Sequence, residues 1–147
     1  IARTCELYKV IYVNNKIAGV YLVLPYEDGY IIDNGVIKLC KDGLRYHGYD
    51  VVSAHYNCRL GEIDIVAEDR KFICFVEVKT RSENMLYSPA DAVDFSKRNK
   101  IIATSQMFIK ENKINKGIRY DIIEVFFEND EPMKINHIKN AFDSDGR

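Results

Sequence analysis

The chain has 147 residues, of which 47% are hydrophobic and 29% charged, and its formal net charge is −1 at pH 7. This size and composition are typical of one globular domain, or of one domain with an appendage, and they allow a buried core. The near-neutral charge argues against a uniformly basic nucleic-acid-binding protein, and since there is no run of about 18 apolar residues, we expect no membrane span.

Four cysteines, at positions 5, 40, 58 and 74, are spread along the chain without a C-x-x-C pair. This spacing argues against a zinc ribbon and against a redox dithiol. Residues 1–5 lack the pattern of a signal peptide. Because scattered single cysteines are usual in a reducing compartment, we expect a cytoplasmic protein.

The first predicted elements are strands over residues 8–13 and 17–24, joined by a turn at 14–16. Their β-branched and aromatic residues and the short polar connection indicate a hairpin. A third short strand is predicted at residues 30–32, and residues 33–35 are interpreted as a turn. We therefore predict a β appendage over residues 1–35 and a second unit over residues 36–147.

That second unit is predicted to begin with an amphipathic helix over residues 36–47, which Gly48 is placed to end. The residues predicted to face inward are Val36, Leu39, Cys40, Leu44 and Tyr46. Strands are then expected over residues 49–54, 61–67 and 72–79.

A second helix is predicted from Ser88, as its N-cap, to about residue 110. Its predicted buried stripe is Ala92, Phe95, Ile102, Ala103 and Ile109. Strands over residues 118–127 and 133–138 complete the chain. The order helix, three strands, helix, two strands predicts an α/β fold with a mixed central sheet flanked by helices.

Charged residues interrupt the two apolar strands at 61–67 and 72–79. Side chains of a strand alternate between its two faces. Glu62 and Asp64 therefore share one face of the first strand, and Glu77 and Lys79 share one face of the second. A two-residue loop would make Glu77 a diagonal neighbour of Asp64, whereas a four-residue loop would place the two directly opposite each other. Both registers put the four charged side chains on one face.

Carboxylates this close repel each other unless a cation binds them. Hard oxygen ligands favour Mg²⁺ or Mn²⁺, which we expect Asp64 and Glu77 to hold, with the Val78 carbonyl and Glu62 as further ligands. Such an ion activates water, and Lys79 could orient that water or neutralise the transition state. The pattern predicts phosphodiester hydrolysis; a solvated sheet face is the alternative, although both strands are very apolar.

Basic residues near this pair of strands are candidates for contacts with DNA phosphates. Arg81 follows the second strand, and Lys97, Arg98 and Lys100 lie in the predicted second helix. A solvated helix surface is the alternative for the three helix residues, and an ordinary surface arginine is the alternative for Arg81.

The segments G-E-I-D-I-V (61–66) and F-V-E-V-K-T-R (75–81) resemble the YraN-like family of predicted endonucleases. Residues 48–52, the run Arg119-Tyr120-Asp121 and residues 137–142 resemble further motifs of that family, so the likeness covers roughly residues 44–142. The resemblance implies the restriction endonuclease-like fold of the PD-(D/E)xK type, related to Holliday-junction resolvases, and it implies Asp64, Glu77 and Lys79 as the site.

One position departs from that family. Its first helix normally begins with a glutamate that joins the metal site, and Ile37 stands at that place. We therefore expect either a Mg²⁺- or Mn²⁺-dependent endonuclease acting on DNA, with branched or damaged DNA as candidate substrates, or a catalytically weakened nucleic-acid-binding module of the same fold. A homodimer would suit a nuclease that cuts two strands.

A third reading concerns the N-terminal hairpin. Residues 12–20 resemble the central hairpin of N-acetyltransferases, but the glycine-rich acyl-CoA loop of that family does not follow. This leaves a small-molecule enzyme or an interaction domain as the third hypothesis.

Overall fold

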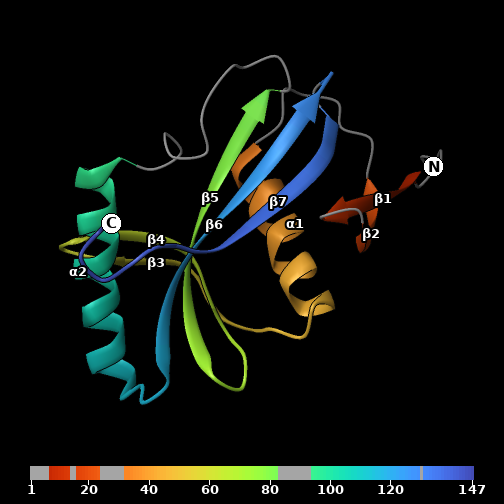
Figure 1. Ribbon diagram of the computed structural model, residues 1–147. Helices are drawn as coiled ribbons and strands as arrows, with labels where there is room; N and C mark the ends of the chain where they lie inside the picture. Colours follow the sequence, from red (N-terminus) through yellow and green to blue (C-terminus); the bar gives the residue numbers. More distant parts are fainter. Residues whose placement is uncertain (1–6, 14–15, 24–31, 83–93, 130) are drawn as a thin grey trace, which may run out of the picture.

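The computed structural model describes residues 7–13, 16–23, 32–82, 94–129 and 131–147 (Figure 1). In chain order the elements are β1 (Leu7–Val13), β2 (Lys16–Val23), α1 (Ile32–Tyr46), β3 (Asp50–Cys58), β4 (Gly61–Glu68), β5 (Phe72–Ser82), α2 (Phe95–Asn112), β6 (Gly117–Glu128) and β7 (Glu131–Phe142). From α1 onward the order is the predicted one. The α/β fold class is confirmed and is consistent with a restriction endonuclease-like core.

The strands form one mixed sheet in the order β2-β1-β7-β6-β5-β4-β3. β5 and β6 run parallel, whereas β3–β4, β4–β5 and β6–β7 are antiparallel. Figure 1 shows α1 packed behind β5–β7 and α2 beside β3 and β4. The two helices therefore cover different parts of a strongly twisted sheet.

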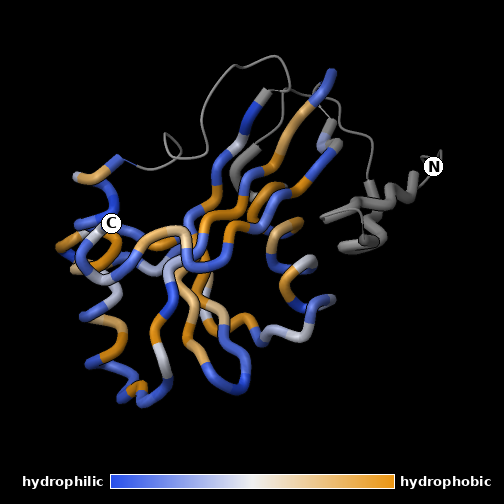
Figure 2. Tube along the Cα trace, in the orientation of Figure 1, coloured by the Kyte–Doolittle hydropathy of each residue, from blue (hydrophilic) through white to orange (hydrophobic). Residues whose placement is uncertain are grey.

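The apolar core consists of two clusters that meet at β5. On the α1 side, Cys40 and Leu44 pack with Val76 and other sheet residues. On the α2 side, Ile101 and Phe108 pack with Phe75 of β5 and with other sheet residues. Phe75 directly precedes Val76 in the chain. Because Phe75 and Val76 are both fully buried, β5 is covered on both faces, and Figure 2 shows the apolar residues concentrated where the strands cross.

The predicted N-terminal hairpin is confirmed, since β1 and β2 pair antiparallel. β1 lies next to β7, with Val13 paired to Ile135 in the parallel sense. Of the predicted third strand at 30–32, residues 30 and 31 lie outside the described part, and Ile32 begins α1 instead. The division of the chain at residue 35 stays a prediction.

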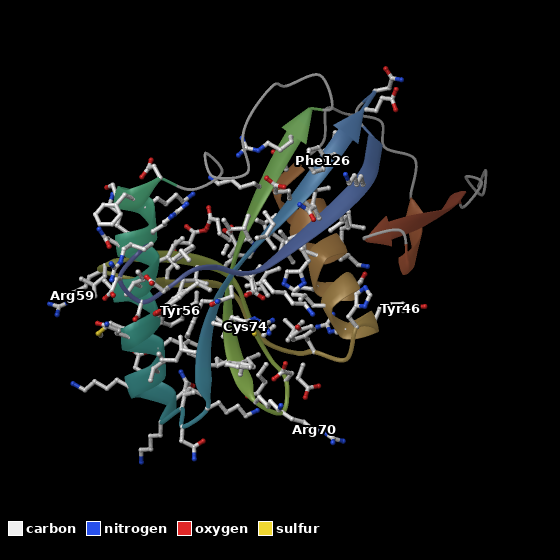
Figure 3. All side chains as sticks on the ribbon, viewed as in Figure 1. Tyr46, Tyr56, Arg59, Arg70, Cys74 and Phe126 are labelled. Carbon is white, nitrogen blue, oxygen red and sulfur yellow. The ribbon has the colours of Figure 1, made fainter. Side chains whose placement is uncertain are left out.

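Helix α1 begins four residues before its predicted start at Val36. Asp33 and Asn34, interpreted as a turn, lie in its first turn, where the unpaired N–H groups and the positive end of the helix dipole favour such residues. Gly48 ends the segment as predicted, with φ at +87°. The inward prediction for Tyr46 is wrong: its side chain is 61% exposed and points away from the protein (Figure 3), because it lies two positions, about 200°, beyond the buried Leu44.

Helix α2 begins at Phe95, and its N-cap is Asp94, whose side chain accepts a hydrogen bond of 2.8 Å from the backbone N–H of Lys97. The predicted start at Ser88 and the predicted buried Ala92 lie outside the described residues. The burial prediction for Phe95 is wrong, since it is 61% exposed at the first position of the helix. Other members of the predicted stripe are buried or half-buried: Ile102, Ala103 and Ile109. Neither described helix is long and apolar enough to cross a membrane.

Candidate metal centre between β4 and β5

The register of β4 against β5 decides how the two predicted acids meet. The paired residues run from Ile65↔Val76 to Glu68↔Ile73, so residues 69–72 form a four-residue connection. Asp69 holds this turn, because its side chain accepts hydrogen bonds from the N–H groups of residues 71 and 72, of 2.7 and 2.8 Å. The four-residue alternative is therefore confirmed, and its register continues to Asp64 opposite Glu77.

At that point β4 and β5 stop pairing through their backbones. The Val78 N–H instead donates a 2.8 Å hydrogen bond to the Asp64 carboxyl. The Asp64 side chain also lies within hydrogen-bonding contact of Glu77. The aspartate thus takes the place of a backbone partner and presents its carboxyl group to the second acid.

Two lysines complete this charged group. Lys79 follows Glu77 on the same face of β5, with its Nζ 3.5 Å from Glu77 Oε1. Lys97, in the first turn of α2, forms an ion pair with that same oxygen. Glu77 itself is only 5% exposed, so these ammonium groups supply much of the compensation that water would give an exposed carboxylate.

The environment shifts the pKa of three of these groups. Burial, followed by the charge of Glu77, raises the pKa of Asp64 from 3.8 to about 6, although the Val78 N–H opposes the shift. Burial and the neighbouring Lys97 lower the pKa of Lys79. Burial acts in the same direction on Lys97, but its hydrogen bond and attraction to Glu77 outweigh burial and raise its pKa. Perturbed groups of opposite sign gathered at one point are typical of functional sites.

The structure does not bring Glu62 to the carboxylate pair. Its side chain is 55% exposed and lies 3.9 Å from His55 Nδ1. Simple alternation predicted one face for Glu62 and Asp64, but Ile63 and Ile65 pack in different core clusters, so β4 twists between them. Within the described part of the chain, no group of three or more His, Cys, Asp or Glu could hold a metal ion.

Two carboxylates are nevertheless a suitable donor set for Mg²⁺ or Mn²⁺. Mg²⁺ keeps several waters and is commonly held by one or two carboxylates together with substrate phosphates. Asp64 and Glu77 are hard oxygen donors in contact with each other, and they lie on two strands that hold them rigidly. Val78 contributes its N–H to Asp64, and its carbonyl stays a predicted ligand.

The predicted DNA-contact residues separate in the structure. Arg81 is half-buried. It lies two positions beyond Lys79 and therefore on the same face of β5, in one row with Glu77 and Lys79. Lys100 is exposed on α2. Arg98 instead faces the C-terminal segment, where it donates to the Gly146 carbonyl and lies over the Phe142 ring.

One polar residue beside the site was not predicted. Glu124 on β6 is paired with Lys79 in the parallel β5–β6 register. It is 1% exposed and accepts a hydrogen bond of 3.1 Å from Asn136. The only local indication that Glu124 lies near the core is its position directly after the apolar residues 122–123. Its place beside Lys79 follows from the register of two strands about 40 residues apart, which could not be predicted from the sequence.

Ile37, at the position where the resemblance led us to expect a glutamate, is 6% exposed and belongs to the apolar cluster on the α1 side. A carboxylate there would be buried among aliphatic side chains without a partner, at a high energetic cost. The isoleucine therefore fits its surroundings, and α1 adds no acid to the pair within the described residues.

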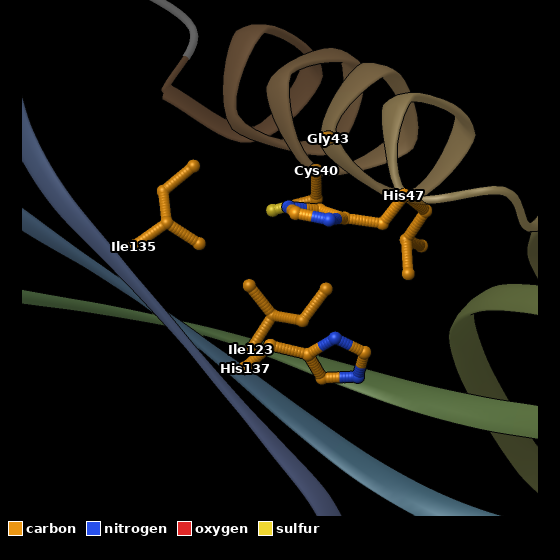
Figure 4. Close-up of a pocket in the computed structure, with 7 residues that line it drawn as sticks. Cys40, Gly43, His47, Ile123, Ile135 and His137 are labelled. Atoms are coloured by element: carbon orange, nitrogen blue, oxygen red, sulfur yellow. The ribbon is translucent and has the colours of Figure 1, made fainter. Parts of the chain in front are cut away.

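A pocket beneath α1 is a separate feature (Figure 4). It is lined by Cys40, Gly43, Leu44, His47, Ile123, Ile135 and His137. Burial, followed by the charge of Asp64, raises the pKa of the Cys40 thiol above its usual range, which disfavours the reactive thiolate. His137 Nε2 lies 2.8 Å from Asp121 Oδ2, which gives this histidine a structural partner.

Comparisons with known proteins identify the family of this chain. The profile of a family described as "Uncharacterised protein family UPF0102" matches residues 38–125. A UPF0102 protein of Clostridium botulinum (strain 657) is 40% identical over 107 residues, which cover 71% of this chain and 87% of the relative. A UPF0102 protein of Clostridium tetani is 41% identical over 106 residues, with the same coverage. The region that the profile matches contains the β4–β5 pair with both carboxylates, and it begins within α1.

Proposed function

Since this chain belongs to the uncharacterised family UPF0102, the YraN-like family, we propose that it is a divalent-metal-dependent endonuclease that hydrolyses phosphodiester bonds of DNA. The observation that carries the proposal is the contact between Asp64 and Glu77 where β4 leaves β5, with Lys79 beside them. Branched or damaged DNA is the candidate substrate class.

In this proposal Asp64 and Glu77 would hold one Mg²⁺ or Mn²⁺ ion, and the chemistry that such an ion would supply is activation of a water molecule and polarisation of a phosphate oxygen. The Val78 N–H keeps the Asp64 carboxyl oriented. Lys79 is held by Glu77 at the edge of the pair, where its ammonium can stabilise negative charge that develops on the phosphate. Arg81 continues the row and offers a guanidinium to the DNA backbone.

The deciding experiment is a cleavage assay on duplex, single-stranded, nicked and four-way-junction DNA with Mg²⁺ or Mn²⁺. We expect Glu77→Gln to cut at least about a hundredfold more slowly, because a metal ion contributes several kcal/mol and each step of about 1.4 kcal/mol is tenfold in rate. Glu62→Gln is the matched control and should cut at the wild-type rate, since Glu62 lies away from the pair. Equal cleavage by wild-type protein and Glu77→Gln would exclude this site.

The second candidate function is a nucleic-acid-binding module without catalysis, which the apolar surroundings of Ile37 favour. In that case no DNA is cut, but binding persists and depends on basic residues. Arg81→Ala and Lys100→Ala should then weaken DNA binding for every sequence and reduce its dependence on salt.

A further inference from the structure

Lys97 places its positive charge beside the carboxylate pair, where a bound metal ion would place its positive charge. Its ammonium forms an ion pair with Glu77 Oε1, and the same oxygen is 3.5 Å from Lys79 Nζ. Lys97 also interacts electrostatically with Asp64. The helix residue therefore contacts Glu77 directly, and its charge also acts on Asp64.

The charges of these four groups cancel when both acids are ionised, since two carboxylates contribute −2 and two ammonium groups +2. A divalent cation added to these four groups would leave them with a combined net charge of +2. Uncompensated charge in a poorly solvated site is unfavourable. Binding of a divalent ion would therefore favour the departure of an ammonium group.

Lys97 is the lysine better placed to leave. Its side chain is 44% exposed and starts from the first turn of α2, whereas the Lys79 side chain is 25% exposed and starts from the central strand β5. A flexible lysine side chain can turn into solvent, where its ammonium is well hydrated. Lys79 can therefore stay beside Glu77 while Lys97 moves.

We propose that Lys97 is a positioning residue that fills the carboxylate pair in the metal-free protein and withdraws when a divalent ion binds. The inference rests on the metal site proposed above. In the metal-free protein the lysine holds Asp64 and Glu77 together and neutralises their charge. After withdrawal its ammonium lies at the rim of the site, where it can contact an anionic ligand.

The test measures Mn²⁺ affinity of the full chain by isothermal titration calorimetry at pH 8. We expect Lys97→Met to bind Mn²⁺ about tenfold more tightly than wild type, because a competing charge-assisted contact is gone. Lys97→Arg, which keeps the cation, should stay close to wild type. The matched control is Lys110→Met, which removes an exposed lysine in the last turn of α2 and should leave the affinity unchanged.

A second readout is thermal unfolding with and without Mn²⁺. Ligand binding to the native state stabilises it. We therefore expect Mn²⁺ to raise the unfolding midpoint of Lys97→Met by more than it raises the midpoint of the wild-type protein. If Lys97→Met fails to fold, Lys97→Gln provides the same comparison.

The two proposals fail in distinguishable ways. Wild-type protein that binds Mn²⁺, together with a Lys97→Met or Lys97→Gln variant that binds it equally or more weakly, would overturn the role of Lys97 and leave the metal site standing. Wild-type protein that binds no Mn²⁺ at millimolar concentrations would overturn the site itself.

Discussion

Asp64 is the residue whose chemistry depends most on its surroundings. Burial and the charge of Glu77 raise its pKa from 3.8 to about 6. In the folded protein it therefore keeps a proton between about pH 4 and pH 6 that the unfolded chain releases. The stability it contributes is present at low pH, falls as the pH rises through this window and is absent above about pH 6.

From this shift we predict that Asp64→Asn stabilises the metal-free protein. The amide keeps an oxygen that can accept the Val78 hydrogen bond but carries no charge, so at pH 8 the free energy of unfolding should rise by about 1–2 kcal/mol. The gain should shrink as the pH is lowered from 8 toward 4. Urea unfolding at several pH values measures it, with the exposed Asp50→Asn as control; a gain that does not depend on pH would contradict the assignment.

At the scale of the elements, the packing of α2 against the β3–β4 turn depends on Gly61. This glycine has φ at +154°, and a Cβ there would lie 2.9 Å from Thr104 Oγ1. Thr104 is fully buried and donates its hydroxyl to the Lys100 carbonyl, so it cannot move away freely. The helix that carries Lys97 is positioned by this close approach.

We therefore predict that Gly61→Ala destabilises the protein by more than the backbone strain of about 1–3 kcal/mol alone. Gly48→Ala is the matched control, because Gly48 also has positive φ, at +87°, but an added Cβ would meet no atom within 4 Å. Chemical denaturation of both variants separates strain from collision. Equal losses would show that the contact with Thr104 is relieved at little cost.

At the scale of the whole molecule, a buried ionic network ties β6 and β7 to the residue before β3. Asp121 is fully buried, and its carboxylate accepts hydrogen bonds from Arg119 and from the Asn140 N–H and contacts His137. Arg119 also donates to the Tyr49 hydroxyl. Burial alone would raise the pKa of Asp121, but hydrogen bonds with His137, Arg119 and Asn140 outweigh burial and hold this pKa below its usual range.

We predict that Asp121→Asn lowers the free energy of unfolding by about 3–5 kcal/mol near neutral pH, since Arg119 then stays largely buried without its counter-charge. Because the pKa of Asp121 is lowered in the fold, this difference should be full above about pH 4 and decrease as the pH falls further. Asp42→Asn is the control: Asp42 also contacts two basic side chains, but on the surface, where about 0–1 kcal/mol is expected. Equal losses in the two variants would contradict a structural role for the network.

Much of the fold followed from local patterns. The alternation of apolar residues predicted every strand from β3 to β7, and the stripe of Val36, Leu39, Cys40 and Leu44 predicted the buried side of α1. The errors lie at element ends. Tyr46 and Phe95 stand in terminal turns, where the helix extends beyond the surface that it covers, so local amphipathicity does not determine burial.

The sequence by itself determined that Asp64, Glu77 and Lys79 belong to adjacent strands and that Glu77 and Lys79 share a face, because alternation is a property of each strand alone. Only the tertiary structure decided the rest. The hydrogen bonds of the turn at Asp69 set the register that puts Asp64 opposite Glu77. The twist of β4 moves Glu62 away, and the packing of α2 brings in Lys97. The turn is local, but the sequence left its length open between two and four residues. The other two placements depend on contacts between segments distant in sequence, and no local pattern encodes the geometry of such contacts.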